Sequence, residues 1–239
     1  MAWYAYCIME QKDLSGSTRA RRPFPLNNIF GIGETQVFAY PVGEFAVVVS
    51  EYAGQLVQQA VVQHSKVVSE CFRSSTVLPF KFGTVFDTDE ALRRSVKANR
   101  RGFTESVCRL RGKAEMHLKV VVKDGSLREA MMDVDLPHTT GGEYLKVLRE
   151  KAAKHRERQT KARALSVQVH KLFNPLQEEV CCRKDASGSM QLDIAHLIDH
   201  KSVEKYQSRY SSAARLLQGC ELLITGPWPP YHFTPNKTA

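Results

Sequence analysis

The chain of 239 residues is 43% hydrophobic and 25% charged, which is ordinary for a folded protein and excludes global disorder. Its length leaves open one large domain or two of modest size. A formal net charge of +9 favours acidic partners, whether nucleic acid, anionic lipid or an acidic protein surface, and the sign alone does not choose among them.

The first residues of the chain predict a β-sheet. Trp3 to Met9 is apolar at nearly every position, which is typical of a central strand buried on both faces. The run is short and follows no basic segment, so we expect neither a signal peptide nor a transmembrane span. Gln11 to Asn28 is polar and contains the basic cluster Arg19 to Arg22, which predicts a long exposed loop. Gln36 to Tyr40 and Phe45 to Ser50 flank a Pro-Val-Gly-Glu turn and predict a hairpin.

Two helices are predicted around an extended segment. Apolar residues recur at helical spacing from Val57 to Cys71, and His64 lies on this apolar face, so we expect a core histidine in preference to a ligand. Leu78 to Phe86 alternates aromatic residues around a proline and a glycine, which favours an edge strand or an irregular extended segment. A capping pattern at Asp87 then begins a second amphipathic helix, which is expected to end at Gly112.

The second half of the chain predicts the order β, α, β, β, α, β. Strands are expected at residues 115–122, 176–183, 190–198 and 220–225, and helices at residues 143–172 and 203–217. This is the order of elements in a ferredoxin-like fold. We therefore predict an α+β protein with two domains and a tail. These are an N-terminal α+β domain at residues 1–112, a ferredoxin-like (βαββαβ) domain at residues 113–224, and a proline-rich tail at residues 225–239 that packs back.

The segment from Thr225 to Phe233, Thr-Gly-Pro-Trp-Pro-Pro-Tyr-His-Phe, is the most unusual stretch of the chain. Its three prolines fix φ and remove backbone donors, so we expect a stiff, polyproline-like ribbon and not an interior strand. Trp228, Tyr231 and Phe233 need apolar partners. Two interpretations stay open: these side chains dock on their own protein, or the tail binds a partner, for which its PxxP spacing is suited.

The sequence contains no motif of a known catalytic or metal site, since HExxH, Walker A, GxSxG and zinc-ribbon spacings are absent. His196 and His200 are four residues apart, but their surroundings alternate as in a strand, so we predict a strand face in preference to a metal pair. Cys181 and Cys182 would point to opposite faces of a strand. No CxxC pair occurs among the six cysteines, so we expect buried free thiols in a reducing cytosol. We expect no catalysis, no metal and no cofactor.

The predicted helix at residues 143–172 has the most basic surface of the chain. A ferredoxin-like sheet can bind RNA through aromatic side chains, so nucleic-acid binding by this helix and sheet is the alternative function. The inner positions of the predicted strands are aliphatic, however, and no RNP-type run occurs. A small enzyme or ligand-binding module on the same fold is a third class.

Three sequence blocks resemble the GvpL/GvpF family of gas vesicle proteins: Tyr4 to Ile8, Leu78 to Phe86 and Thr225 to Phe233, with Leu192 to Leu197 as a weaker fourth. The blocks occur in the family's order and span nearly the whole chain. The resemblance implies a non-catalytic, cytoplasmic accessory protein of gas vesicle formation. It also implies binding to the small hydrophobic shell protein GvpA and to other gas vesicle accessory proteins, with neither a membrane nor a nucleic acid as partner.

A shell subunit that polymerises into an apolar wall exposes apolar surface before assembly, so a helper needs an apolar contact region on a charged body. We expect the N-terminal domain to present this region. The candidate contacts are the aromatic side chains of the predicted hairpin and extended segment: Phe38, Tyr40, Phe45, Phe80, Phe82 and Phe86. Because the tail and the Leu78 to Phe86 block recur together in the family, we expect the tail to dock at the domain interface, with Trp228 largely buried.

Overall fold

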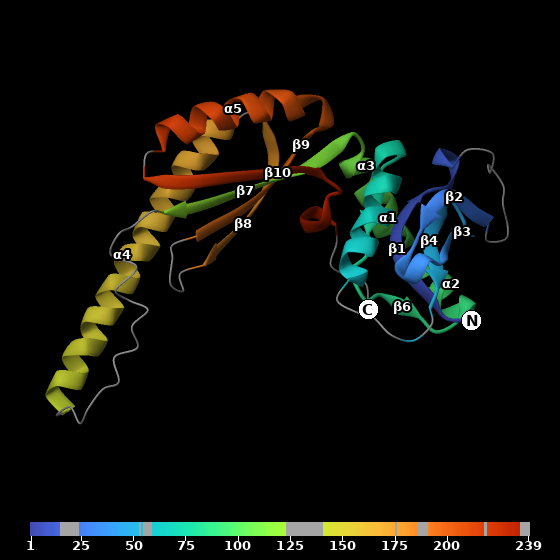
Figure 1. The fold of residues 1–239 in the computed structure, drawn as a ribbon, viewed down its shortest axis with the longest axis horizontal. Coiled ribbons are helices and arrows are strands. Elements are labelled where there is room, and N and C mark those ends of the chain that lie inside the picture. Colours follow the sequence, from blue (N-terminus) through green and yellow to red (C-terminus); the bar gives the residue numbers. More distant parts are fainter. Residues whose placement is uncertain are drawn as a thin grey trace. The chain divides into compact units, whose positions relative to one another are not determined.

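The structure, a computed structural model, describes residues 1–14, 24–52, 54, 59–122, 141–174, 176–185, 191–217 and 219–234. It has a mixed α/β fold, and the chain divides into two compact units (Figure 1). The first unit contains Met1–Glu115 and Trp228–Ala239, and the second contains Met116–Pro227. The first division lies close to the boundary predicted near Gly112, whereas the predicted tail is divided between the two units. The basic cluster Arg19 to Arg22 lies outside the described residues.

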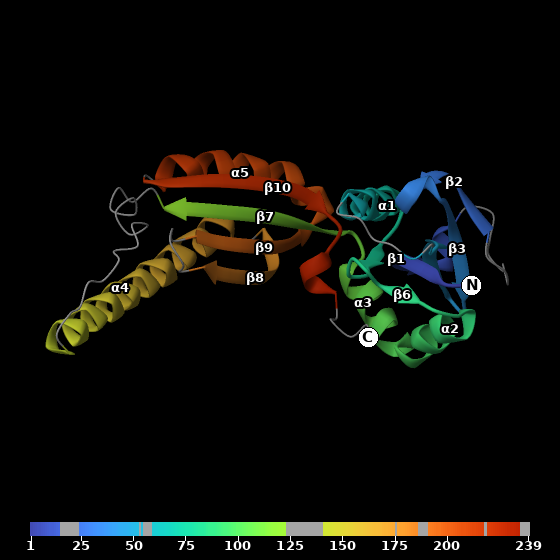
Figure 2. The same cartoon turned by 60° about the horizontal axis from the view of Figure 1, so that its bottom comes forward.

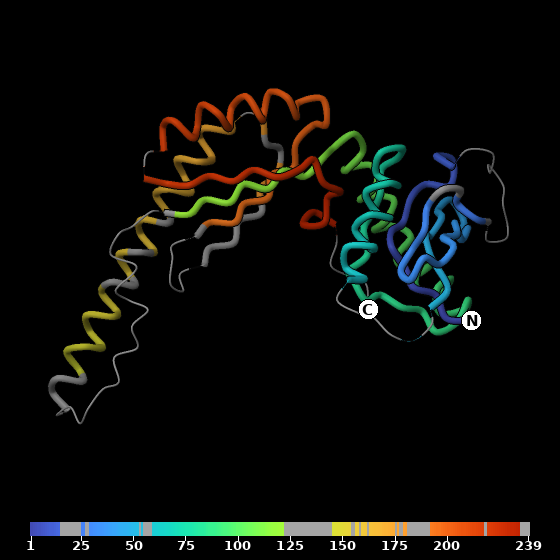
Figure 3. The backbone as a smooth tube through the Cα atoms, viewed as in Figure 1, coloured from blue at the N-terminus to red at the C-terminus, as the bar shows by residue number. Residues whose placement is uncertain are grey.

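Six strands form the sheet of the first unit: β1 (Trp3–Glu10), β2 (Phe24–Phe30), β3 (Gln36–Val42), β4 (Phe45–Glu51), β5 (Val77–Pro79) and β6 (Val85–Phe86). They lie in the order β2, β3, β4, β1 and β5, and β6 also pairs with β1. All of these pairings are antiparallel. Every side chain from Trp3 to Met9 is buried, so the predicted central strand is confirmed. Figure 3 traces the backbone through these strands.

A β-bulge in β1 decides which of its side chains share a core. The register against β4 shifts between Ala5 and Cys7, which leaves Tyr6 as the extra residue. Tyr4 and Tyr6, and then Cys7 and Met9, therefore belong to the same hydrophobic cluster. In a regular strand, alternation would send the second pair to the opposite face.

Three helices cover this sheet: α1 (Ala60–Ser74), α2 (Asp89–Ala98) and α3 (Arg100–Leu110). Figure 2 shows α1 on one side of the sheet and α2 with α3 on the other. In agreement with this, α1 contacts β1, β2 and β5, whereas α2 contacts β3 and β6. His64 is buried on α1, as its place on the apolar face predicted.

Two predictions for this unit were wrong. The predicted loop at residues 11–28 gives way to β2 after residue 23, because the exposed edge of β3 offers a ladder and an edge strand tolerates Pro25. The single helix predicted after Asp87 is two helices that break at Asn99, whose side-chain amide donates to the Ser95 carbonyl at 3.0 Å. The N-cap of α2 is Thr88, whose hydroxyl accepts the Ala91 N–H.

The second unit is a four-stranded sheet packed against two helices. Its elements are β7 (Lys113–Val122), α4 (Gly141–Phe173), β8 (Gln177–Asp185), β9 (Gln191–Asp199), α5 (Val203–Leu216) and β10 (Cys220–Trp228). The strands lie in the order β10, β7, β9, β8. Alternate residues of β7 and β9 form a core with Val169 and Phe173 of α4 and Tyr206 of α5. None of the described helices is both long and apolar enough to cross a membrane.

The last strand differs from its prediction. We expected it to end at Thr225 and a polyproline-like ribbon to follow, but β10 continues through Pro227 to Trp228. It lies at the edge of its sheet, where a proline without an N–H interrupts no interior ladder. The edge position therefore allows a strand where composition predicted a ribbon.

Candidate functional site

The turn between β5 and β6 presents the most exposed of the six aromatic contact candidates, Phe82, at 41% exposure. The Thr84 N–H and hydroxyl both donate to the Lys81 carbonyl, at 3.1 and 2.7 Å, and close the turn. Gly83 has φ +88°, a left-handed conformation that side chains other than glycine rarely adopt. The Phe80 N–H donates to the Tyr6 carbonyl and fixes the turn to β1. The hydrogen-bonded turn thus keeps the Phe82 ring exposed to solvent.

A buried pair of side chains, Tyr4 and His64, supports this turn from the core of the first unit. The Tyr4 hydroxyl accepts the Gly83 N–H at 3.1 Å and lies 2.9 Å from His64 Nδ1. Burial raises the pKa of Tyr4 to about 12. Burial also lowers the pKa of His64 to about 4, partly offset by the Phe80 backbone. His64 is therefore neutral near pH 7, and a protonated Tyr4 can donate to it while it holds the turn.

The structure separates the six aromatic candidates into two groups. Phe82 is exposed, and Phe38 and Phe86 are half-buried. Tyr40, Phe45 and Phe80 are buried and build the core. Because they are buried, these three cannot form a preformed contact surface. The sequence alone did not show on which face of the sheet α2 and α3 pack, so it could not separate them from the exposed rings. The accessible candidates are Phe82, Phe38 and Phe86.

A polar network anchors α2 to the sheet beside Phe38. The Trp3 indole N–H and the Tyr40 hydroxyl donate to the two carboxylate oxygens of Asp89, at 2.8 and 2.6 Å. Hydrogen bonds from Tyr40 and Trp3 lower the pKa of Asp89. Arg93 Nε donates to the Tyr40 hydroxyl at 2.9 Å, and its guanidinium carbon lies 4.9 Å from the ring centroid. This network fixes the first turn of α2 and the stem of Arg93.

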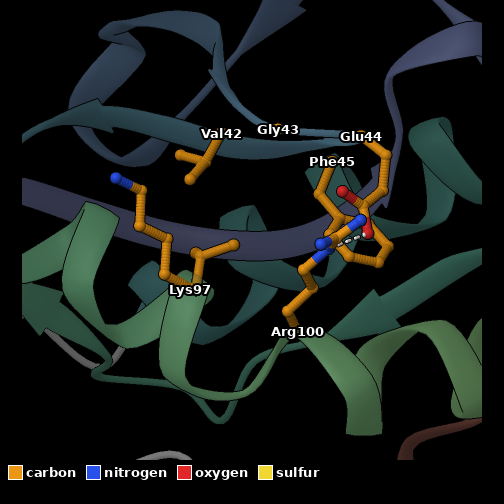
Figure 4. A pocket seen from close by; sticks show the side chains of 7 residues that line it. Val42, Gly43, Glu44, Phe45, Lys97 and Arg100 are labelled. Atoms are coloured by element: carbon orange, nitrogen blue, oxygen red, sulfur yellow. Dashed lines mark hydrogen bonds and ion pairs between the residues drawn. The ribbon is translucent and has the colours of Figure 1, made fainter.

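A hollow of about 490 Å³ opens next to the turn between β3 and β4. Val42 to Phe45 line its hairpin side, and Val96, Lys97 and Arg100 line its helical side (Figure 4). Arg100 Nε donates to Glu44 at 2.7 Å. Burial is the largest single influence on Glu44 and opposes its ionisation, but the hydrogen bond and charge of Arg100, with hydrogen bonds from the Glu44 backbone and Thr104, together lower the pKa of the carboxyl. A second hollow along α2 shares Lys97 with the first, and we call the two together the basic groove.

The C-terminal aromatic residues have different environments. Trp228 is 42% exposed, so the prediction that it is largely buried was wrong; it is the last residue of the edge strand β10. Phe233, in the short 3-10 turn Tyr231–Phe233, is buried, and its carbonyl accepts from Arg109. Tyr231 packs against the core of the first unit. His232 donates its backbone N–H to the buried Glu115 carboxylate at 2.8 Å.

The histidine pair of the second unit does not form a helical metal pair. His196 is fully buried on β9, with Nδ1 2.6 Å from the Tyr206 hydroxyl, and His200 is exposed in the turn that follows. The predicted strand face is thus confirmed. Among the described cysteines Cys7 and Cys71 are buried free thiols, but Cys108 is exposed, which departs from the expectation of buried thiols. The side chains of Cys181 and Cys182 lie outside the described part of the structure.

A family model described as gas vesicle synthesis protein GvpL/GvpF matches residues 2–235. The chain belongs to the GvpL/GvpF family. The resemblance of its sequence blocks to this family is therefore confirmed, and the protein has a role in gas vesicles.

Relatives and solved structures agree with this GvpL/GvpF membership. Gas vesicle protein L1 of Halobacterium salinarum is 24% identical over 263 aligned positions, which cover 98% of this chain and 90% of that protein. Gas vesicle protein L of a Streptomyces species is 23% identical over 71% of this chain and 66% of that protein. The crystal structure of GvpF from Anabaena superposes with a TM-score of 0.70 at 17% identity, covering 98% of both chains. GvpF from Microcystis aeruginosa gives 0.71 at 19% identity, covering 98% of this chain and 99% of that one.

Sequence reasoning missed the basic groove of this GvpL/GvpF protein. A signal was present, since Glu90, Arg93, Arg94 and Lys97 follow the i, i+3, i+4, i+7 spacing of one helix face. The sequence did not show that this face continues into a hollow at the hairpin turn. That depends on the break at Asn99, which places Arg100 opposite Glu44.

Proposed function

We propose that this GvpL/GvpF protein is a non-catalytic, cytoplasmic assembly factor that binds the hydrophobic shell protein GvpA and assists or nucleates shell formation, together with other gas vesicle accessory proteins. Membership of the family over residues 2–235 carries the assignment to gas vesicles. The binding of GvpA is the finer part of the proposal, and it rests on the first unit.

Phe82 is the principal shell-protein contact in this proposal, and Phe38 and Phe86 are secondary. An exposed ring held by a closed turn loses little conformational entropy when it enters an apolar surface. Aromatic anchors of this kind supply much of the binding energy of protein interfaces. The ring of Phe82 lies 6.3 Å from Tyr4 and 5.9 Å from His64, between centroids, which supports its orientation from one side.

The second unit serves as a scaffold in this proposal. Its elements follow the order β, α, β, β, α, β, and its strands lie in the order β10, β7, β9, β8. We assign it on this basis to the ferredoxin-like class.

Replacement of Phe82 tests the shell-protein contact. Phe82→Ser is expected to reduce the amount of GvpA that co-purifies with the tagged full-length chain about tenfold, because one buried aromatic anchor contributes about 1–2 kcal/mol to binding. Gas vesicle yield in a complementation assay should fall in parallel. The measurement is quantitative recovery of GvpA after bacterial co-expression.

Leu223→Ser is the matched control, because Leu223 is a 56% exposed apolar side chain of the second unit. Its recovery of GvpA should stay within about twofold of the original protein. If Phe82→Ser recovered as much GvpA as the original protein, Phe82 would not be part of the contact. Equal losses in both variants would show that general surface hydrophobicity, and not the Phe82 turn, binds the shell protein.

A further inference from the structure

The basic groove carries an inference beyond the proposed shell-protein contact. It follows the outer face of α2 from Arg93 and Arg94 to Lys97 and ends at Arg100, beside the hairpin turn. Three of these four cations share one face of α2, because residues three and four apart are neighbours on a helix. From Arg93 to Lys97 the face extends over about 6 Å, at 1.5 Å per residue, which corresponds to about one turn of a docked helix.

Two cations of the groove are held in place by the protein itself. Arg93 is fixed by the hydroxyl and ring of Tyr40. Arg100 is fixed by Glu44, and the hydrogen bond raises the pKa of this arginine. Both side chains have therefore lost part of their rotamer freedom before any partner arrives.

The other two cations, Arg94 and Lys97, are exposed and have no hydrogen-bond or ion-pair partner among the described residues. In the sequence they lie between Arg93 of α2 and Arg100, the first residue of α3. Carboxylates spaced one helical turn apart could pair with both, and the fixed Arg93 and Arg100 would add to the local positive potential.

The remaining walls of the groove select between classes of polyanion. Glu44 and Glu90 also line it, and their carboxylates would repel the continuous phosphates of a nucleic acid. Phe45 and Val96 are almost fully buried in its floor, so the groove offers no open ring for base stacking, and the aliphatic stems of Lys97 and Arg100 are its accessible apolar surface. A polypeptide that alternates carboxylates with apolar residues satisfies both features.

We propose that the basic groove binds an acidic, amphipathic segment of a partner protein, with its carboxylates on Arg94 and Lys97 and an apolar side chain against the aliphatic stems of Lys97 and Arg100 at the hairpin end. The only aromatic candidate that lines the groove is the buried Phe45, so this site is separate from the Phe82 contact.

The test uses the full-length protein and fluorescence anisotropy. The probe is a fluorescein-labelled, alanine-based helical peptide with glutamates on one face and a leucine beside them; the comparison peptide has glutamine at each glutamate. We expect the glutamate peptide to bind at least about tenfold more tightly than the glutamine peptide at low salt, with an advantage that shrinks as salt rises. The double variant Arg94→Glu, Lys97→Glu should lose at least about tenfold of this binding.

The control variant Arg73→Glu, Arg101→Glu changes net charge equally at two exposed arginines outside the groove. It should keep binding within about twofold, and Phe82→Ser should bind the peptide like the original protein. Equal loss in the control double variant, or equal binding of the two peptides, would overturn the proposal. Tighter binding of a single-stranded oligonucleotide that Arg94→Glu, Lys97→Glu abolishes would assign the groove to nucleic acid instead.

Discussion

Acidification from pH 6.5 to 5 is expected to lower the free energy of unfolding of the second unit by about 2 kcal/mol through His196 alone. His196 is fully buried on β9, where it contacts Tyr206 and Phe173. Burial, with a smaller contribution from the neighbouring His170, lowers the pKa of His196 to about 3.

Acid destabilises the second unit because the unfolded chain binds more protons at His196 than the folded chain does. The pKa of His196 is lower in the folded chain than the value of about 6.5 in the unfolded chain, so the unfolded state binds more protons between these values. The contribution of neutral His196 to the free energy of unfolding is complete above pH 6.5. It is lost as the pH falls toward 3, by about 1.4 kcal/mol per pH unit. His64 acts in the same direction in the first unit, where its pKa is about 4.

Hydrogen exchange of β9 and α5 amides, corrected for the intrinsic pH dependence of exchange, measures this loss in the second unit separately. His196→Gln removes the titrating ring and keeps an acceptor for the Tyr206 hydroxyl, so its stability should change by less than about 0.5 kcal/mol over the same pH range. His200→Gln makes the same chemical change at an exposed position and should retain the full pH dependence. An unchanged slope in His196→Gln would show that another group titrates.

The parts of the fold that the sequence predicted are those in which local pattern and tertiary burial agree. β1 is apolar on both faces and is buried on both faces, and α4 spans residues 141–173 where periodicity predicted 143–172. Long periodic segments identify their own structure because one face of each must be buried.

The wrong predictions depend on neighbours that the sequence does not specify. β2 forms because the edge of β3 is free, and β10 extends past Pro227 because it is an edge strand. The helix break at Asn99 depends on a side-chain hydrogen bond that competes with the helical backbone. In each case an edge pairing or a side-chain hydrogen bond decided the secondary structure against the prediction from residue composition.

The candidate contact site shows the same limit. The sequence identified the right segments, but aromatic identity does not distinguish a core ring from a surface ring. Phe80 and Phe82 are only two residues apart, and no pattern in the sequence predicts which of them is more exposed. In the structure Phe80 is buried and Phe82 is exposed. The turn at Gly83 produces this difference.

Phe45→Ala is expected to lower the free energy of unfolding of the first unit by about 3–5 kcal/mol, the usual cost of deleting a buried phenylalanine. Phe45 is 2% exposed at the start of β4, and its ring packs edge-on against Phe103 of α3 with 6.1 Å between centroids. Its removal leaves a cavity between the hairpin and α3. The surrounding elements can close it only in part, because the Arg100 and Glu44 pair fixes the same corner.

Denaturant unfolding of a Trp228→Phe background, followed by tryptophan fluorescence, measures this change, because the remaining Trp3 is buried in β1 of the first unit. Phe82→Ala deletes the same atoms from an exposed ring and should cost less than about 1 kcal/mol. Weaker GvpA recovery by Phe45→Ala should then follow its folded fraction, whereas a loss in Phe82→Ala should occur in a folded protein. If both variants proved equally stable, Phe45 would not be a core residue, and it would return to the set of candidate surface contacts.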